Sequence, residues 1–434
     1  MRYNQLMDFI VQTSSLAGAI SVPSSKSHTL RAILFASLAA GSSTITHYLA
    51  SPDTNAMING CRLLGANIEI GPNQLLINGV NGKIEGAENV IDAGNSGLVL
   101  RFISAIAALG SQPVIITGDR SIRQQRPMQP LIDAINQLQG SALSTRNNGF
   151  APLIIQGPLR GGTAHLNGAD SQPVSALLIA SAFAKSPITI NVDQPGEKPW
   201  IDLTLAWLDR FNIHYQREGY TKYYMQGNSA IQGFEYTVPA DWSSAAFPIV
   251  AALITHSEIT LQNMDIHDSQ GDKKLLSILE KMGAQIEIKE STQSIKVKKS
   301  GSLQGQVIDV NDLIDALPIL SVLGCYAKGE TRLVNGAVAR NKECDRIRCI
   351  ALELRKMGAR IREDVDGLTI QHAPLFGAQV DSHEDHRMAM ALAVAGFAAQ
   401  GSMRIKNATC VSKTYTPFVA HFQKLGAHII EEEG

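Results

Sequence analysis

The sequence has few of the features that mark whole classes of protein. Its 434 residues include only five cysteines, which are scattered, odd in number and without CxxC spacing. This usage argues against a disulfide framework or a zinc site and predicts buried or inert thiols. No run approaches 18 apolar residues, and the first eleven residues lack the regions of a signal peptide. We therefore expect a cytoplasmic protein that does not associate with membranes.

The chain also lacks an excess of charge of either sign. Lys and Arg number 38 against 39 Asp and Glu, which gives a net charge of −1. This balance excludes a surface that wraps a polyanion, so no nucleic-acid partner is expected, and any bound anion needs a local cluster of cations. Apolar residues make up 44% of a chain this long, which predicts two or more domains.

What the chain does contain is a repeat of about 70 residues. Its clearest mark is a helix end of the form Leu-Gly-Ala, with two weaker copies in the gaps. Most copies precede alternating apolar and polar residues and a turn, so each repeat is expected to close with a hairpin. The six marks are Leu64-Gly65-Ala66, Leu138-Gln139-Gly140, Phe211-Asn212-Ile213, Met282-Gly283-Ala284, Met357-Gly358-Ala359 and Leu425-Gly426-Ala427.

The beginning of each repeat is a polar corner followed by an Ala-rich helix. The corners lie near Ser27, Ser96, Ser171, Ser243, Asp315 and Asp385. The helices that follow are apolar on nearly every face, which predicts burial, and they cover residues 32–40, 98–109, 174–184, 245–254, 316–326 and 388–399. Later helices over 273–282 and 346–357 are amphipathic and should lie nearer the surface.

The repeat predicts the fold class. Six βαβαββ units indicate an α/β protein, a two-domain inside-out α/β barrel whose domains each hold three units, with buried parallel helices and outer sheets. We expect one domain over residues 25–240 and another over 1–24 plus 241–434, with the active site in the cleft between them. Helix N-termini that face one cleft would bind an anion together. The alternative is that the polar corners are only helix caps.

The side chains at these corners favour anion binding. The first corner covers Ser24 to Arg31, and its two cations, Lys26 and Arg31, flank a predicted helix start. The alternative is an ordinary capped helix with solvated cations. The later corners add the Gly94-Asn95-Ser96-Gly97 turn with Arg101, the arginines Arg120, Arg123 and Arg126, acidic Asp315, and the charged stretches 339–346, 383–388 and 410–414. Solvated surface arginine remains the alternative for Arg120 and Arg123. Together these corners gather cations and acids at helix starts, as a functional site would.

On these motifs the chain resembles the EPSP synthase (3-phosphoshikimate 1-carboxyvinyltransferase) family over essentially its whole length, and its first motif is most similar to the chlamydial branch. The motifs are Pro23-x-x-Lys26-Ser27-x-x-x-Arg31, Gly94-Asn95-Ser96-Gly97-x-x-x-Arg101, Arg126-Pro127, Ser171-Gln172, Lys198-Pro199-Trp200-Ile201-Asp202, Asp315-Ala316, Lys342-Glu343-x-Asp345-Arg346, Asp385-His386-Arg387-Met388-Ala389 and Cys410-Val411-Ser412-Lys413-Thr414.

The resemblance implies transfer of the enolpyruvyl group of phosphoenolpyruvate to the 5-hydroxyl of shikimate 3-phosphate, by a monomer without metal or organic cofactor. It places the phosphoenolpyruvate phosphate on Lys26, Arg126 and Lys413 and the carboxylate on Arg346 and Arg387, mainly in the domain with residues 241–434. The resemblance implies that shikimate 3-phosphate binds mainly to the other domain. Its implied ligands are Ser27, Arg31 and Gln172, with Ser171 on the 3-phosphate.

The resemblance also implies roles in catalysis. Asp315 would take the proton of the 5-hydroxyl, and Glu343 and Lys413 would move the proton at the methylene carbon. With Lys26 these are the candidate catalytic residues. The resemblance adds Asn95 and Lys342 as substrate-binding residues, and Gly97 would let backbone approach phosphoenolpyruvate.

Two positions depart from the family pattern. Asp170 and Glu197 stand where serines usually touch the 3-phosphate, and carboxylates there repel a phosphate dianion. One alternative is therefore a related transferase with a different or unphosphorylated acceptor. The relative acting on UDP-N-acetylglucosamine is a second alternative, but its loop cysteine is missing from residues 118–127. A catalytically silent anion-binding protein is a third, although it would not need Asp315 or Glu343.

Overall fold

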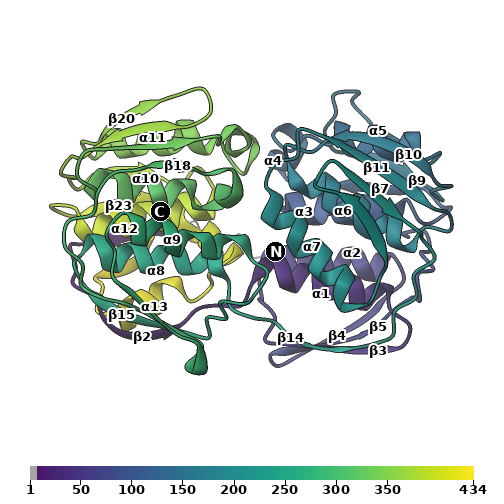
Figure 1. Ribbon diagram of the computed structural model, residues 1–434, viewed down its shortest axis with the longest axis horizontal. Coiled ribbons are helices and arrows are strands. Elements are labelled where there is room, and N and C mark those ends of the chain that lie inside the picture. The colour runs from purple at the N-terminus through teal and green to yellow at the C-terminus, as the bar shows by residue number, and fades with distance from the viewer. Residues whose placement is uncertain (1–6) are drawn as a thin grey trace. The chain divides into compact units, whose positions relative to one another are not determined.

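The computed structural model describes residues 7–434, which divide into two compact units (Figure 1). One unit is Ser24–Val238, and the other joins Pro239–Gly434 to the N-terminal segment that ends at Pro23. The first six residues of the expected 1–24 segment lie outside the described residues. In the second unit the Asp241 N–H donates to the Pro23 carbonyl at 2.8 Å, which ties the two chain crossings together. Over residues 7–434 no helix has the length and apolar character needed to cross a membrane.

The Ser24–Val238 unit contains three four-stranded sheets. Each begins with a parallel pair and continues with antiparallel strands. In sheet order the strands are β14 (Glu235–Thr237), β3 (Ser42–Thr46), β5 (Gln74–Asn78) and β4 (Asn67–Gly71); β6 (Ile91–Asp92), β7 (Val114–Thr117), β9 (Leu153–Gln156) and β8 (Ser141–Ser144); and β10 (Gly162–Asn167), β11 (Ile188–Asp193), β13 (Lys222–Met225) and β12 (Tyr215–Glu218).

Three helices of this unit are buried along almost their whole length, as their sequences predict: α1 (Lys26–Leu38), α3 (Gly97–Ala107) and α6 (Ser171–Phe183). Each begins at a side-chain cap, because Ser25, Ser96 and Asp170 accept from backbone N–H groups of the first turn. The remaining helices are α2 (Pro52–Leu63), α4 (Arg120–Gln124), α5 (Gln129–Gln137) and α7 (Lys198–Arg210).

The other unit repeats this plan with three more sheets. Their strands in order are β2 (Ala17–Ser21), β15 (Glu258–Gln262), β17 (Ser294–Val297) and β16 (Ile286–Lys289); β18 (Val307–Asp309), β19 (Glu330–Val334), β21 (Leu368–Gln371) and β20 (Arg360–Glu363); and β22 (Gln379–Asp381), β23 (Met403–Lys406), β1 (Met7–Val11) and β24 (Ile429–Glu433).

Three buried helices of this second unit pack against one another in pairs, and in Figure 1 they lie inside strands β15, β20 and β23. They are α8 (Trp242–Ile254), α10 (Leu317–Tyr326) and α12 (His386–Ala398). The other helices are α9 (Leu275–Lys281), α11 (Arg346–Lys356) and α13 (Phe418–Lys424), with 3-10 turns η1 (Gly271–Lys274), η2 (Glu290–Thr292), η3 (Asn311–Ala316), η4 (Ala337–Asn341) and η5 (Ala408–Lys413).

Two local predictions need correction. The amphipathic helix expected over 273–282 begins two residues later, at Leu275, because the preceding residues form the tighter turn η1. Five repeats close with the expected hairpin, but the sixth does not. Its strand β24 pairs with β1 from the other end of the chain, in a register that sets Met7 opposite Glu433. The first strand of the chain therefore completes the last repeat.

Candidate active site

Arg346 is the centre of a buried charge network in the unit that contains α11. It is the first residue of α11, and its guanidinium contacts three carboxylates: Asp385 at 2.7 Å, Asp315 at 2.8 Å and Glu343 at 2.7 Å. Burial alone would lower the pKa of Arg346, but the charges of these carboxylates outweigh it and hold the pKa well above its ordinary value. The arginine is therefore a fixed positive charge at the start of a helix.

Asp315 joins Arg346 to a second arginine. One Asp315 oxygen accepts from Nη1 of Arg346 at 2.8 Å, and the other accepts from Nη2 of Arg387 at 2.7 Å. Both arginines occupy the first turns of helices, where the N-terminal dipole also favours an anion. The two guanidinium groups thus share a single carboxylate, which is the geometry that would bind the carboxylate of a small ligand.

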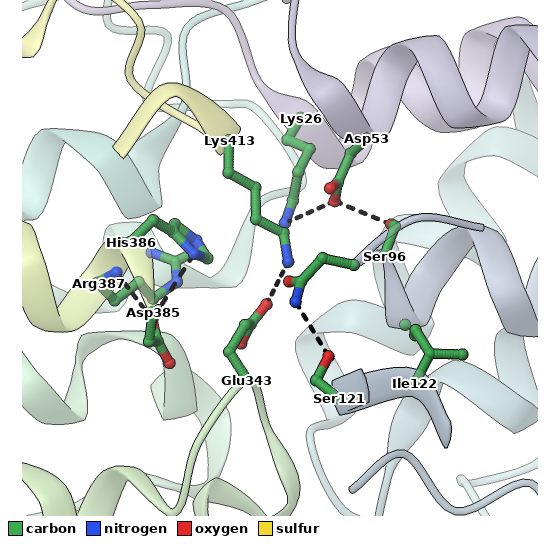
Figure 2. A network of polar contacts seen from close by, with 12 residues as sticks. Lys26, Asp53, Ser96, Ser121, Ile122, Glu343, Asp385, His386, Arg387 and Lys413 are labelled. Carbon is green, nitrogen blue, oxygen red and sulfur yellow. Dashed lines mark hydrogen bonds and ion pairs between the residues drawn. The ribbon is translucent and has the colours of Figure 1, made fainter. Parts of the chain in front are cut away.

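Glu343 is held between two cations. Its oxygens accept from Arg346 at 2.7 Å and from Nζ of Lys413 at 2.6 Å, and the Lys413 pair is drawn in Figure 2. All three side chains are nearly excluded from solvent. This proximity of an ionisable acid to a lysine is suited to proton transfer. Lys342, the neighbour of Glu343, is also buried.

One group in the described part of the chain has atoms close enough to hold a metal ion. Glu343, Asp385 and His386 offer ligand atoms within 4.8 Å of one another. Both carboxylates already accept hydrogen bonds from Arg346, and Lys413 contacts the first. These positive charges would repel a metal cation, so we interpret the group as part of the anion-binding network.

In the Ser24–Val238 unit, Lys26 begins α1 and lies 3.4 Å from a buried carboxylate, Asp53. The same Asp53 oxygen accepts from the hydroxyl of Ser96 at 2.8 Å, as Figure 2 shows. Ser96 in turn caps α3. The first two predicted corners are therefore connected through Asp53.

The second corner gathers residues around Gly97. Arg101 donates to Gln172 Oε1 at 3.2 Å and to the Gly97 carbonyl at 3.2 Å. A Cβ on Gly97 would lie 2.5 Å from Arg101 and 3.6 Å from the guanidinium carbon of Arg126. A side chain at position 97 would therefore require the Arg101 guanidinium to move. Asn95 turns to the neighbouring loop and donates to Asp119 at 2.6 Å and Ser121 at 3.0 Å.

The two unusual carboxylates are both engaged within this unit. Asp170 caps α6 through the Gln172 N–H and lies 3.2 Å from Arg101. Glu197 is buried and accepts from Ser171 twice, from its N–H at 2.9 Å and from its hydroxyl at 3.0 Å. Glu197 therefore contacts Ser171, the residue that the family resemblance assigns to the 3-phosphate.

Arg31 is buried among hydrogen-bond acceptors of its own unit. Its guanidinium donates to Thr204 Oγ1 at 2.8 Å, to the Ser27 carbonyl at 3.2 Å and to the Trp200 carbonyl at 3.4 Å. It also lies 5.1 Å from the ring centre of Phe102. Burial lowers its pKa to about 9.

Several residues of these networks were not predicted as site residues. Asp53 and Asp119 are the clearest, together with Asp385, which was noted only as part of a corner. An acid in the first turn of a helix, as at Asp53 in α2, is usually explained by the helix dipole. The sequence gives no signal that Asp53 also contacts Lys26 and Ser96, because those contacts are made in the fold.

The fold and these clusters define an α/β protein whose helix starts carry paired cations and acids. A family model described as EPSP synthase (3-phosphoshikimate 1-carboxyvinyltransferase) matches residues 10–422. The 3-phosphoshikimate 1-carboxyvinyltransferase of Acetivibrio thermocellus is 43% identical over 419 residues, covering 96% of this chain and 98% of that protein. That of Chlamydia pneumoniae is 44% identical over 428 residues, covering 98% and 95%.

A solved structure agrees with these sequence relatives. The EPSP synthase of Acinetobacter baumannii superposes with a TM-score of 0.82 at 27% identity, covering 98% of this chain and all of that one. The chain belongs to the EPSP synthase family, so the resemblance stated from the motifs is confirmed.

Proposed function

We propose that this protein transfers the enolpyruvyl group of phosphoenolpyruvate to the 5-hydroxyl of shikimate 3-phosphate, in the shikimate pathway to chorismate and aromatic amino acids. The observation that carries this proposal is the pair Arg346 and Arg387, which share the Asp315 carboxylate at 2.8 and 2.7 Å. A ligand carboxylate that took this place would leave Asp315 available to accept the proton of an attacking hydroxyl.

The reaction balances without an outside oxidant or cofactor. The acceptor oxygen bonds to C2 of phosphoenolpyruvate while a proton is added to its methylene carbon, which gives a tetrahedral intermediate. The C2–O bond to phosphate then breaks, and a proton leaves the methyl group. We assign the hydroxyl proton to Asp315 and the carbon-bound proton to the Glu343 and Lys413 pair, whose atoms are 2.6 Å apart.

The phosphate groups need cations of their own. Lys26, Arg126 and Lys413 are the proposed ligands of the phosphoenolpyruvate phosphate, and Lys342 is a further substrate-binding residue. The acceptor is assigned to Ser27, Arg31, Ser171 and Gln172. Gly97 lets backbone approach phosphoenolpyruvate, and Asn95 is a further substrate-binding residue. In this proposal residues 25–240 mainly hold the shikimate phosphate, the rest of the chain mainly holds phosphoenolpyruvate, and each domain is an inside-out α/β barrel. A monomeric state and a cytoplasmic location stay predictions.

A specific observation favours one second candidate, an acceptor without the 3-phosphate. Glu197 accepts from both the N–H and the hydroxyl of Ser171, so a phosphate at Ser171 must displace a carboxylate or lie against it. An acceptor with a neutral 3-hydroxyl would meet no such repulsion. The same enolpyruvyl chemistry would follow.

Calorimetry with separate ligands tests these assignments. We expect phosphoenolpyruvate and shikimate 3-phosphate each to bind alone. Each should bind an inactive variant more tightly when the other is present. Unphosphorylated shikimate should bind at least tenfold more weakly than its 3-phosphate. Equal binding of the two acceptors would favour the second candidate, and no binding of phosphoenolpyruvate would contradict both.

A further inference from the structure

Two cysteines lie beside the Arg346 network, and the proposed reaction uses neither. Cys344 stands between Glu343 and Asp345, the N-cap of α11, and Cys349 is the fourth residue of that helix. Asp345 caps the helix by accepting from the Arg348 N–H at 3.1 Å, so the two cysteines occupy the position before the cap and the fourth helical position, whose side chains commonly pack together at a capped helix start. Cys344 is buried and Cys349 is partly exposed. An outside reagent can therefore reach Cys349 first.

A histidine and a buried carboxylate complete the cluster. Glu353, one turn after Cys349 on α11, is fully buried, and its Oε1 lies 2.8 Å from Nε2 of His383. His383 also interacts with the Cys349 thiol. Lys356 and the N–H of Asp381 donate to Glu353 as well. The order Cys344, Cys349, His383, Glu353 is a chain of donors and acceptors that would stabilise a thiolate on Cys349.

The charges in the cluster agree with this order. Hydrogen bonds from Cys344 and then from His383 lower the pKa of Cys349 to about 6. The bonds to Cys349 and Glu353 raise the pKa of His383 to about 10. By contrast, burial raises the pKa of Cys61 and of Cys325 to about 12. The sequence predicts buried or inert thiols, which describes Cys61 and Cys325 but not Cys349.

We propose that Cys344 and Cys349 form a thiol–disulfide switch, in which Cys349 is the attacking thiolate and a low-molecular-weight disulfide is the oxidant. The Cys349 thiolate attacks one sulfur of the disulfide, forming a mixed disulfide and releasing one thiolate. Cys344 then loses its proton and attacks the Cys349 sulfur, which releases the second thiol. Two protein thiols are oxidised and the reagent is reduced to two thiols, so electrons and atoms balance.

The disulfide would disturb the Arg346 network. Cys344 Sγ lies 3.7 Å from Oδ2 of Asp385, the same oxygen that accepts from Nε of Arg346 at 2.7 Å. A bond of about 2.05 Å to Cys349 requires the Cys344 sulfur to move along α11. Glu343 and Arg346 flank this residue closely, so we expect them to shift and activity to fall. This last step rests on the proposed function.

Peptide mapping tests the chemistry without an activity assay. The reduced full-length protein is incubated with glutathione disulfide, blocked with iodoacetamide and digested with trypsin. Cleavage after Arg346 and Arg348 places the two cysteines in separate peptides, 343–346 and 349–355. We expect these peptides to be joined by a disulfide. The mass of the linked pair should then be two hydrogens less than the summed masses of the two separate peptides. Cys344→Ser should stop at a glutathione adduct on Cys349, and Cys349→Ser should give neither product.

The rate of the first step has matched controls in the same chain. At pH 6 a thiol of pKa about 6 is half ionised while an ordinary thiol is about 0.1% ionised; allowing for its lower nucleophilicity, Cys349 should be alkylated about 20-fold faster than an ordinary accessible thiol. His383→Gln should reduce this advantage, because it removes one of the two hydrogen bonds that lower the pKa of Cys349, and buried Cys61 and Cys325 should be slower still. An unlinked wild type, or equal rates at Cys349 with and without His383, would overturn the proposal.

Phosphate release measured on the same samples separates the two proposals. The oxidised wild type should lose at least tenfold in activity and recover it with dithiothreitol, while Cys349→Ser should keep its activity in the oxidant. A linked protein that is fully active would overturn the coupling to the site. A reduced protein without any activity would instead contradict the proposed function and leave the mapping result unaffected.

Discussion

Replacing Asp315 with asparagine should separate ligand binding from turnover. In the free protein the Asp315 carboxylate is bound by Arg346 and Arg387, so an incoming carboxylate has to displace it. A hydrogen bond to a charged group contributes about 1.5–3 kcal/mol, and a neutral acceptor is roughly half as strong. Because Asp315 is about one-fifth exposed, we discount the two bonds to a net gain of about 1–2 kcal/mol. Asp315→Asn should then bind phosphoenolpyruvate about 5–30-fold more tightly.

Turnover should change in the opposite direction. The amide cannot accept the hydroxyl proton, so phosphate release should fall by about 10²–10⁴-fold. Binding is measured by titration calorimetry with phosphoenolpyruvate alone, and turnover by phosphate release with both substrates. Asp312→Asn is the matched control, because that carboxylate lies in the same turn but pairs with the exposed Lys274 at 2.8 Å. Unchanged or weaker binding in Asp315→Asn would refute the assignment of the two arginines.

Three further predictions address other parts of the site. Lys26→Ala should reduce phosphate release by at least about 10²-fold while far-UV circular dichroism stays unchanged, since Lys26 lies in the first turn of α1; loss of helical signal would point to a structural role. Glu197→Gln should bind shikimate 3-phosphate about 3–10-fold more tightly and shikimate equally, because it removes a charge but keeps an acceptor for Ser171; a similar gain for both acceptors would contradict this. Burial, with the nearby Asp315 charge, raises the pKa of Asp272 from 3.8 to about 7. Between these two pH values the folded state keeps a proton that the unfolded chain loses, so stability falls as pH rises from about 4 to about 7. Asp272→Asn should therefore raise the free energy of unfolding by up to about 4 kcal/mol at pH 8 and change it little at pH 4, measured by urea denaturation; equal effects at both pH values would argue against a proton on Asp272.

The buried helices could be predicted because each one's own sequence indicates that it is buried. Segments such as 174–184 are apolar on every face, and only a helix enclosed by other elements satisfies that pattern. The pairing of β1 with β24 could not be predicted, because it joins Phe9 to Glu431 across the whole chain and follows from no local signal. The repeat indicated that a strand was needed there but not which end of the chain would supply it.

The same division holds for the candidate site. The types of residue at each corner were evident from the sequence, and they were sufficient to identify the family. The contacts were not. Arg346 meets carboxylates 31 and 39 residues away, and Glu197 meets Ser171 across 26 residues, so these pairs exist only once the helices pack. Sequence reasoning identified Glu197 as unusual but could not show that it would occupy the hydrogen-bonding groups of Ser171.

The central claim is that this protein transfers an enolpyruvyl group to shikimate 3-phosphate. The most direct measurement is phosphate release from phosphoenolpyruvate in the presence of that acceptor, with the product followed by mass spectrometry. We predict one phosphate released for each acceptor consumed, and a product heavier than shikimate 3-phosphate by the enolpyruvyl group that replaces the hydroxyl hydrogen. No phosphate release, or release without this product, would contradict the account.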